Sequence, residues 1–205
     1  YLDTPTKHVY DLIMQTVYPR SSLGRDIIGF PQAIKSIRRQ DFINYLAKTY
    51  QPRNMVVSVS GKVDHQQIVK QVKAYFNHLR NSNSQLTYRP VKLQQKKPRI
   101  NILTKQTDQA HLALALPALP RGHKDEATLS ILETILGVGM SSRLFLEVRE
   151  KRGLCYYVHT FTEKFAETGL FGVAAGLNLN KLDDSLLAIL NEFKKLKTQP
   201  VTPQE

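Results

Sequence analysis

Apolar residues recur at helical spacing three times within the first 80 positions. The pattern predicts one helix that ends at Pro19, a second that stops before Pro52, and a third that Asp64 caps, because proline has no backbone N–H and aspartate accepts hydrogen bonds from a first turn. The apolar run at 55–60, between the last two helices, predicts a short buried strand. The apolar faces of the three helices consist of Val9, Leu12, Ile13, Val17, Phe42, Ile43, Leu46, Ala47, Tyr50, Ile68, Val69, Val72, Tyr75, Phe76 and Leu79.

Strand patterns become more frequent after residue 99. Short apolar or alternating runs predict strands at 100–103 and 111–116, and a later strand pair ends within 169–179. Helical spacing predicts a helix at about 124–136 and a last one from 181 or 182 to 197. Strand pairs grouped with helices in this way indicate an α+β fold, with helices packed on a mostly antiparallel sheet. The polar, proline-containing stretch at 81–99 predicts a linker.

Residues 136–161 carry the richest local pattern in the chain. Gly137 and Gly139 follow an apolar helix, and both can adopt positive φ, so the backbone can leave that helix there. A short charged helix follows and ends at Gly153, after which apolar and polar residues alternate as in a strand. This order places Arg149 near the end of the short helix and Tyr156 near the start of the strand, one tight glycine turn apart.

A guanidinium and a phenol on two rigid elements around one turn can both donate hydrogen bonds to one external carbonyl oxygen or oxyanion. Arg149 and Tyr156 are therefore candidate binding residues. The alternative is a surface ion pair for Arg149 and a core contact for Tyr156. Spacing alone favours this alternative, because charged side chains on short helices are usually only solvated.

The residues around this pair form a longer run that resembles a known family signature. The run consists of Gly139, Ser141, Ser142, Arg143, Leu144, Phe145, Val148, Arg149, Glu150, Lys151, Arg152, Gly153, Leu154, Tyr156 and Val158. It is similar to the second-domain signature of the pitrilysin or insulinase-type zinc metallopeptidases, which include mitochondrial processing peptidase and many bacterial zinc proteases. In that family an arginine and a tyrosine, separated by six residues, lie in the domain opposite the zinc and bind the substrate backbone near the scissile bond. Arg149 and Tyr156 have this spacing, and the departures at Val138 and Cys155 do not disturb the pair.

The first part of the chain resembles the same family at Tyr50, Pro52, Asn54, Met55, Val56, Val57 and Gly61. The resemblance implies that residues 1–80 are the second half of a first metallopeptidase-like domain, and that 100–205 begin a second, similar domain that binds substrate and lacks zinc. In the family, two such domains face each other like a clamshell. Neither domain would be complete in this chain. We therefore expect its open sheet edges to pair with a missing zinc-bearing half, with a partner subunit, or with a second copy by dimerisation or strand exchange.

The family holds its zinc with the inverted motif His-x-x-Glu-His and a further glutamate downstream. This motif is absent from the sequence. The nearest approach is His123, Asp125 and Glu126, and Ala127 stands where the second histidine would be required. We interpret Asp125 and Glu126 as first-turn acids that complement a helix dipole. We therefore expect no metal, no cofactor and no catalytic residue in this chain, with zinc implied only for a longer parent protein.

Composition agrees with an ordinary globular protein. The 205 residues are 41% hydrophobic and 22% charged, and no apolar run approaches the ~20 residues that span a bilayer, so no membrane partner is expected. Cys155 is the only cysteine, which excludes an internal disulfide and fits a reducing compartment such as the cytoplasm. Tyr1 is not an initiator methionine, so we expect the sequence to begin inside a longer polypeptide.

The formal charge of +12, with a sequence pI near 9.8, is compatible with an anionic partner such as nucleic acid. The basic residues lie on several separate elements, and no helix-turn-helix pattern or zinc-finger spacing directs them to bases, so nucleic acid is the less favoured partner. The resemblance implies instead a substrate-binding and structural segment of a zinc metalloendopeptidase that cleaves extended peptides, inactive by itself. Two alternatives stay open: a non-catalytic partner or scaffold subunit of a processing-peptidase-like complex, and an anion or nucleic-acid binder.

Overall fold

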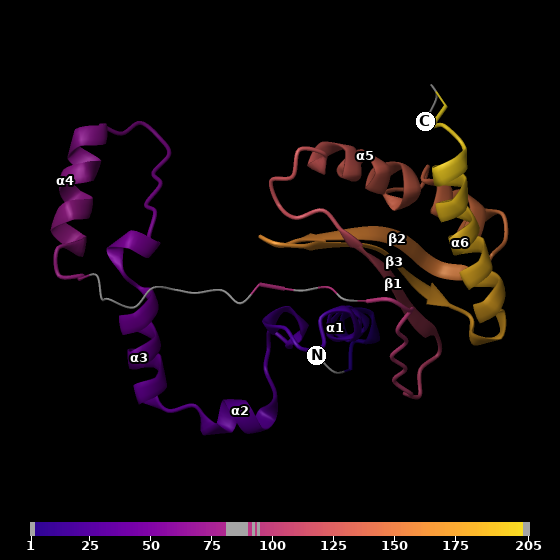
Figure 1. The fold of residues 1–205 in the computed structure, drawn as a ribbon, viewed down its shortest axis with the longest axis horizontal. Coiled ribbons are helices and arrows are strands. Elements are labelled where there is room, and N and C mark those ends of the chain that lie inside the picture. Colours follow the sequence, from indigo (N-terminus) through magenta and orange to yellow (C-terminus); the bar gives the residue numbers. More distant parts are fainter. Residues whose placement is uncertain (1–2, 81–89, 92, 94, 203–205) are drawn as a thin grey trace. The chain divides into compact units, whose positions relative to one another are not determined.

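The computed structural model describes residues 3–80, 90–91, 93 and 95–202. The chain divides into two compact units, drawn as ribbons in Figure 1. The larger unit combines residues 1–26 with residues 90–205, and the smaller unit comprises residues 27–89. The larger unit contains the sheet and carries both Arg149 and Tyr156.

An antiparallel sheet forms the centre of the larger unit (Figure 1). Its strands are β1 (Ala110–Ala118), β2 (Cys155–Lys164) and β3 (Gly169–Leu177), in the spatial order β1-β3-β2. β2 and β3 form a hairpin, and β1 pairs with the other side of β3, so that every residue of β3 is buried. This arrangement confirms the α+β fold and the antiparallel sheet expected from the sequence.

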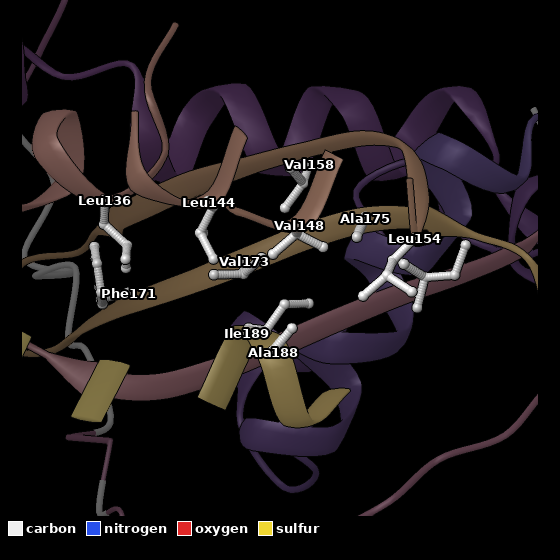
Figure 2. Close-up of a cluster of buried hydrophobic side chains, with 11 residues drawn as sticks. Leu136, Leu144, Val148, Leu154, Val158, Phe171, Val173, Ala175, Ala188 and Ile189 are labelled. Carbon is white, nitrogen blue, oxygen red and sulfur yellow. The ribbon is translucent and has the colours of Figure 1, made fainter. Parts of the chain in front are cut away.

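Helices cover one face of this sheet. They are α5 (Glu126–Gly137), the π-helix η3 (Phe145–Glu150) and α6 (Leu182–Thr198), which follows a short 3-10 helix, η4 (Leu179–Lys181). Alternate residues of β3 point to these helices, because successive side chains of a strand project to opposite faces. Figure 2 shows the resulting core, whose buried members are Leu136, Leu144, Val148, Leu154, Val158, Phe171, Val173, Ala175, Leu177, Ala188 and Ile189.

The opposite face of the sheet packs against α1 (Pro5–Val17), which leads into a 3-10 helix, η1 (Ser22–Gly24). The Tyr10 hydroxyl shares a hydrogen bond of 2.7 Å with Nε2 of His159 in β2, and the Tyr10 ring meets Phe161 edge to face, with 5.0 Å between centroids. The apolar pattern predicted this helix. It did not indicate that the helix packs on strands 150 residues further along the chain, as the contacts of Tyr18 with Thr168 and Gly169 also show.

Glycines in β3 let aromatic rings lie against the central strand. A Cβ on Gly176 would lie 2.4 Å from the Tyr157 ring, and one on Gly172 would lie 2.6 Å from the Phe161 ring. The Tyr157 hydroxyl shares a hydrogen bond of 2.9 Å with Nδ1 of His111 on β1, and both residues are paired with Gly176. A side-chain hydrogen bond therefore joins the two outer strands across the middle one.

The smaller unit is helical throughout its regular described elements. These are α2 (Pro31–Ser36), α3 (Arg39–Thr49), a 3-10 helix, η2 (Pro52–Asn54), and α4 (His65–Phe76). The predicted cap of α4 is confirmed, since Oδ1 of Asp64 accepts a hydrogen bond from N of Gln67 at 2.8 Å. Much of the apolar surface predicted for α3 and α4 is exposed within this chain.

Two of the predicted strands are wrong. Residues 55–60 and 100–103 form no regular structure, and their apolar side chains are exposed, Val56 by 95% and Ile100 by 83%. A strand needs backbone hydrogen bonds from a neighbour. Within the described residues, the sheet includes no strand that pairs with either segment.

Gly137 also differs from expectation. Positive φ occurs at Gly139 (84°) and not at Gly137, which is the last residue of α5. A Cβ on Gly137 would lie 2.6 Å from the backbone nitrogen of Thr160. This glycine therefore allows α5 to approach β2 closely, rather than allowing the chain to turn.

The predicted linker at 81–99 lies largely outside the described residues, and the division into domains at 1–80 and 100–205 stays a prediction. Across the described ranges, no helix is both long enough and apolar enough to cross a membrane.

Candidate functional site

A tight turn joins η3 to β2 and places the two candidate residues on either side of it. Gly153 adopts a φ of 56°, which a glycine accepts without the steric cost that other residues incur. Its N–H donates to the carbonyl oxygen of Arg149 at 3.0 Å, and the N–H of Leu154 donates to that of Val148, also at 3.0 Å. Val148 and Leu154 are both buried in the core, so the turn is fixed at both ends.

Tyr156 lies at a β-bulge. Cys155 is paired with Leu177 and Tyr157 with Gly176, so Tyr156 is the extra residue between two consecutive pairs of the ladder. Bulges redirect a side chain relative to the normal alternation of a strand. Simple alternation would have placed Tyr156 on the core face, as the core-contact alternative assumed, but its side chain is 56% exposed. Its phenol is therefore available to a molecule outside the chain.

Arg149 is exposed near the end of the π-helix, and its guanidinium lies over an aromatic ring. Its Cζ lies 4.8 Å from the centroid of the Phe145 ring, within the range of a cation–π interaction. In the described part of the chain, no carboxylate lies within ion-pair distance of Arg149. The ion-pair alternative for this residue therefore has no partner among the described residues.

The carboxylate beside Arg149 is occupied by other cations. Glu147 forms ion pairs with Arg152 at 2.8 Å and with Lys151 at 3.0 Å. Hydrogen bonds from Arg152 and Lys151 lower the pKa of Glu147 to about 2. Glu147 is thus ionised at neutral pH, and its carboxylate is bound by Arg152 and Lys151.

The charge of Arg149 acts at the first residue of β2. Burial raises the pKa of the Cys155 thiol to about 11, and the positive charge of Arg149 acts on it in the opposite direction. The guanidinium therefore lies close enough to influence Cys155, the residue before Tyr156. That both donors point into one common space stays a prediction.

The residues nearest to a zinc motif do not fit a zinc site. The N–H of Asp125 donates to Nδ1 of His123 at 3.2 Å, so that ring nitrogen is already engaged. Glu126 lies in the first turn of α5, as expected, and accepts hydrogen bonds from Lys164 at 3.0 Å and from the N–H of Gly122 at 2.7 Å. These two bonds lower the pKa of Glu126. Among residues 3–80, 90–91, 93 and 95–202, no three His, Cys, Asp or Glu side chains gather where they could hold a metal ion.

Sequence reasoning missed two groups of polar and aromatic residues. The only sequence signal for the Phe145–Arg149 contact is the four-residue spacing of the two residues, which brings side chains together on a helix. The ring cluster of Tyr10, Tyr157, His111 and His159 left no local signal, because its members come from three distant segments. Burial raises the pKa of Tyr157 to about 12.

Comparison with known proteins gives one consistent result. Residues 36–205 match the protein family described as Peptidase M16 inactive domain. An uncharacterized zinc protease of Streptomyces coelicolor is 35% identical over 99% of this chain and 45% of its own length, and the uncharacterized zinc protease YmxG of Bacillus subtilis is 30% identical over 100% of this chain and 49% of its own. The chain thus spans about half the length of the curated relatives it matches.

Solved structures agree on the fold. A peptidase M16 inactive domain from Pseudomonas fluorescens covers 97% of this chain and 48% of its own, with a TM-score of 0.85 and 23% identity. The match to a protease from Helicobacter pylori covers 96% of this chain and 48% of the protease chain, with a TM-score of 0.82 and 24% identity. These likenesses establish that the described part of the chain has the architecture of such domains.

Proposed function

The chain belongs to the peptidase M16 family through its inactive domain, and from this premise we propose that it is the substrate-binding and structural segment of a zinc-dependent metalloendopeptidase that cleaves extended peptides. The family resemblance expected from residues 139–158 is confirmed. The observation that carries the proposal is the exposure of Arg149 and Tyr156 on the two sides of one fixed turn.

Arg149 and Tyr156 would bind the main chain of a peptide. A guanidinium offers five N–H donors and a phenol one O–H donor, and every peptide presents carbonyl oxygens, so such contacts do not depend on the substrate's sequence. Donors aimed at the carbonyl of the scissile bond also stabilise the negative charge that develops on its oxygen during cleavage. Recognition of this kind suits an enzyme that accepts extended peptides with varied side chains.

Zinc would be held by a part of the longer protein outside this chain. The His123 ring accepts a hydrogen bond from the backbone N–H of Asp125, and Glu126 accepts from Lys164 and from the backbone N–H of Gly122. Within the described residues, these side chains do not form a metal site. We therefore expect the chain by itself to bind no catalytic zinc and to cleave no peptide. The assignment of residues 1–80 and 100–205 to two successive domains, joined at 81–99, belongs to this proposal, as does a cytoplasmic location, which the lone Cys155 favours.

A second candidate is a non-catalytic partner or scaffold subunit, and the match to an inactive domain favours it equally. The residues encoded before Tyr1 discriminate between the two. A His-x-x-Glu-His motif with a downstream glutamate makes the longer protein an enzyme, and its absence makes it a partner subunit.

An anion-binding role rests on the charge distribution. Residues 27–105 hold 15 of the 29 basic residues but two of the 17 acidic ones, so the excess charge is more concentrated than its spread over separate elements suggests. Salt-dependent retention on DNA at physiological ionic strength would favour this role. Binding that vanishes at that ionic strength would leave the charge as a solvated surface.

We predict that replacing either donor lowers turnover in the longer protein. Tyr156→Phe removes one hydroxyl and Arg149→Ala removes the guanidinium, and each variant should lose about a hundredfold to a thousandfold in kcat for a fluorogenic peptide, as loss of an oxyanion donor does. Because both side chains are exposed, the melting temperature should stay within a few degrees of the parent. Unchanged kcat in both variants would remove the pair from the mechanism.

A further inference from the structure

We propose that Phe145 is a positioning residue for Arg149: the Phe145 ring holds the Arg149 guanidinium in place and leaves its N–H donors free for a peptide. This inference rests on the proposed function, because it concerns how Arg149 is presented to substrate.

The contact between the two residues is direct and its base is rigid. The Arg149 Cζ lies 4.8 Å from the centroid of the Phe145 ring. Leu144 and Val148 immediately precede the two residues in the sequence, and both are completely buried in the core. The backbone that carries both side chains is therefore anchored, and the ring provides a fixed surface for the guanidinium.

An aromatic ring and a carboxylate hold an arginine side chain in different ways. A guanidinium that lies over an aromatic face is attracted to the ring without using its N–H groups as hydrogen-bond donors to a carboxylate, so these groups stay available. A bidentate ion pair would instead occupy two of those N–H groups. The first arrangement suits a residue that must donate to an external carbonyl, because the ring orients the guanidinium without occupying its hydrogen-bond donors.

The carboxylate of Glu147 does not compete for Arg149. The carboxylate of Glu147, two residues away, is bound by Lys151 and Arg152 at 3.0 and 2.8 Å. Within the residues that the structure describes, Arg149 has no ion-pair partner. The cation–π contact with Phe145 is thus the interaction to which we assign the orientation of Arg149.

The helical geometry of this segment is unusual as well. The N–H of Lys151 donates to the carbonyl oxygen of Leu146 at 2.9 Å, five residues back, which is the pattern of a π-helix. π-Helical turns are rare in proteins, and those that occur are often found at functional sites. The extra residue in the turn changes the direction of the side chains that follow. Phe145 and Arg149 both lie within this widened turn.

The test is a double-mutant cycle in the longer protein, measured as kcat and KM for peptide cleavage. Phe145→Leu keeps an apolar side chain without a ring, and we expect it to lower kcat about threefold to thirtyfold with little change in KM, the range that a cation–π contact spans. Phe145→Tyr keeps the ring and should retain nearly full kcat. In an Arg149→Ala background, Phe145→Leu should cause no further loss.

A matched control separates positioning from stability. Phe165→Leu makes the same chemical change at a ring that packs edge to face on Tyr18, 6.0 Å between centroids. Among the residues that the structure describes, no guanidinium lies over this ring. This variant should keep the parent's kcat. Phe145→Met provides a second ring-less variant if Phe145→Leu lowers expression.

The possible outcomes are distinguishable. Full kcat in Phe145→Leu and Phe145→Met, or an equal loss with and without Arg149, would overturn the inference while the proposed function stands. Full activity of Arg149→Ala would overturn the inference, and full activity of Tyr156→Phe as well would overturn the proposed function. Loss in the ring-less variants alone, restored by tyrosine and absent without Arg149, is the result that supports it.

Discussion

At the scale of single residues, the central strand β3 contains glycines at positions where the Cβ of any other residue would clash with a neighbour. Gly176 of β3 lies beneath the ring of Tyr157, which is held in place by its hydrogen bond to His111. The space above the strand is therefore already filled by a side chain that cannot rotate away without breaking a contact.

Gly176→Ala should lower the free energy of unfolding by about 1–3 kcal/mol, because the added methyl would lie 2.4 Å from the Tyr157 ring. In a Tyr157→Ala background the same substitution should cost clearly less, since the ring is gone. Gly172→Ala in that background should stay costly, because its methyl would lie 2.5 Å from the carbonyl oxygen of Leu114. Urea unfolding of the four variants measures this, and an equal cost for Gly176→Ala in both backgrounds would contradict it.

Two histidines on the same face make stability depend on pH. Burial lowers the pKa of His111 and of His159 below the ordinary 6.5, so the unfolded chain binds protons at a higher pH than the folded chain does. As pH falls through 6.5 the unfolded state gains protons first, and the free energy of unfolding should fall between pH 7.5 and 5.5. The variant His111→Asn with His159→Gln should be less stable at pH 7.5 but show a flatter dependence.

The control for this pH dependence is an exposed histidine. His65→Gln, at the start of α4, makes the same kind of substitution at an exposed position and serves as the matched comparison. The strongly paired Glu147 does not interfere, because its pKa of about 2 confines its contribution to more acidic solutions. A slope between pH 7.5 and 5.5 that persists in the double variant would show that other groups cause it.

At the scale of elements, what could be predicted depended on whether the stabilising hydrogen bonds are local. α4 was predicted from Asp64 and an apolar stripe, and it runs from His65 to Phe76, because every bond of a helix joins residues close in sequence. The strands predicted at 55–60 and 100–103 failed for the opposite reason. Their apolar residues are typical of strands, but a ladder requires a partner that local patterns do not supply.

The candidate residues could be named from the sequence, but their geometry could not. The resemblance of the surrounding run singled out Arg149 and Tyr156, and their role in binding stays a prediction. The π-helix and the bulge that present them were not, because one extra residue in a helix or a ladder leaves the hydrophobic pattern almost unchanged. The contact of Phe145 with Arg149 belongs to the same class of detail.

At the scale of the molecule, the sheet is open on both sides. β1 and β2 are the outer strands among the described residues, and each has one edge whose backbone N–H and C=O groups lack strand partners there. Apolar surface on α3 and α4 is exposed as well. Edges and surfaces of this kind are covered in stable proteins.

We therefore predict that the 205-residue chain associates with itself when it is produced alone. Sedimentation velocity over a tenfold range of concentration should show a coefficient that rises with concentration, through dimers or strand exchange. The longer protein, in which a zinc-bearing half would cover these surfaces, serves as the control and should sediment with a constant coefficient. A monomeric chain with a single sharp unfolding transition would contradict the prediction.

The packing of α1 on the far strands carries a consequence for biosynthesis. Tyr10 and its partner His159 are 149 residues apart, so the helix leaves the ribosome long before the strands on which it packs. At ~5–20 residues per second, that interval lasts on the order of ten to thirty seconds. Until β2 is synthesised, the nascent chain displays an amphipathic helix whose partners on that strand are missing, and a chaperone that binds exposed apolar surface would act in this period.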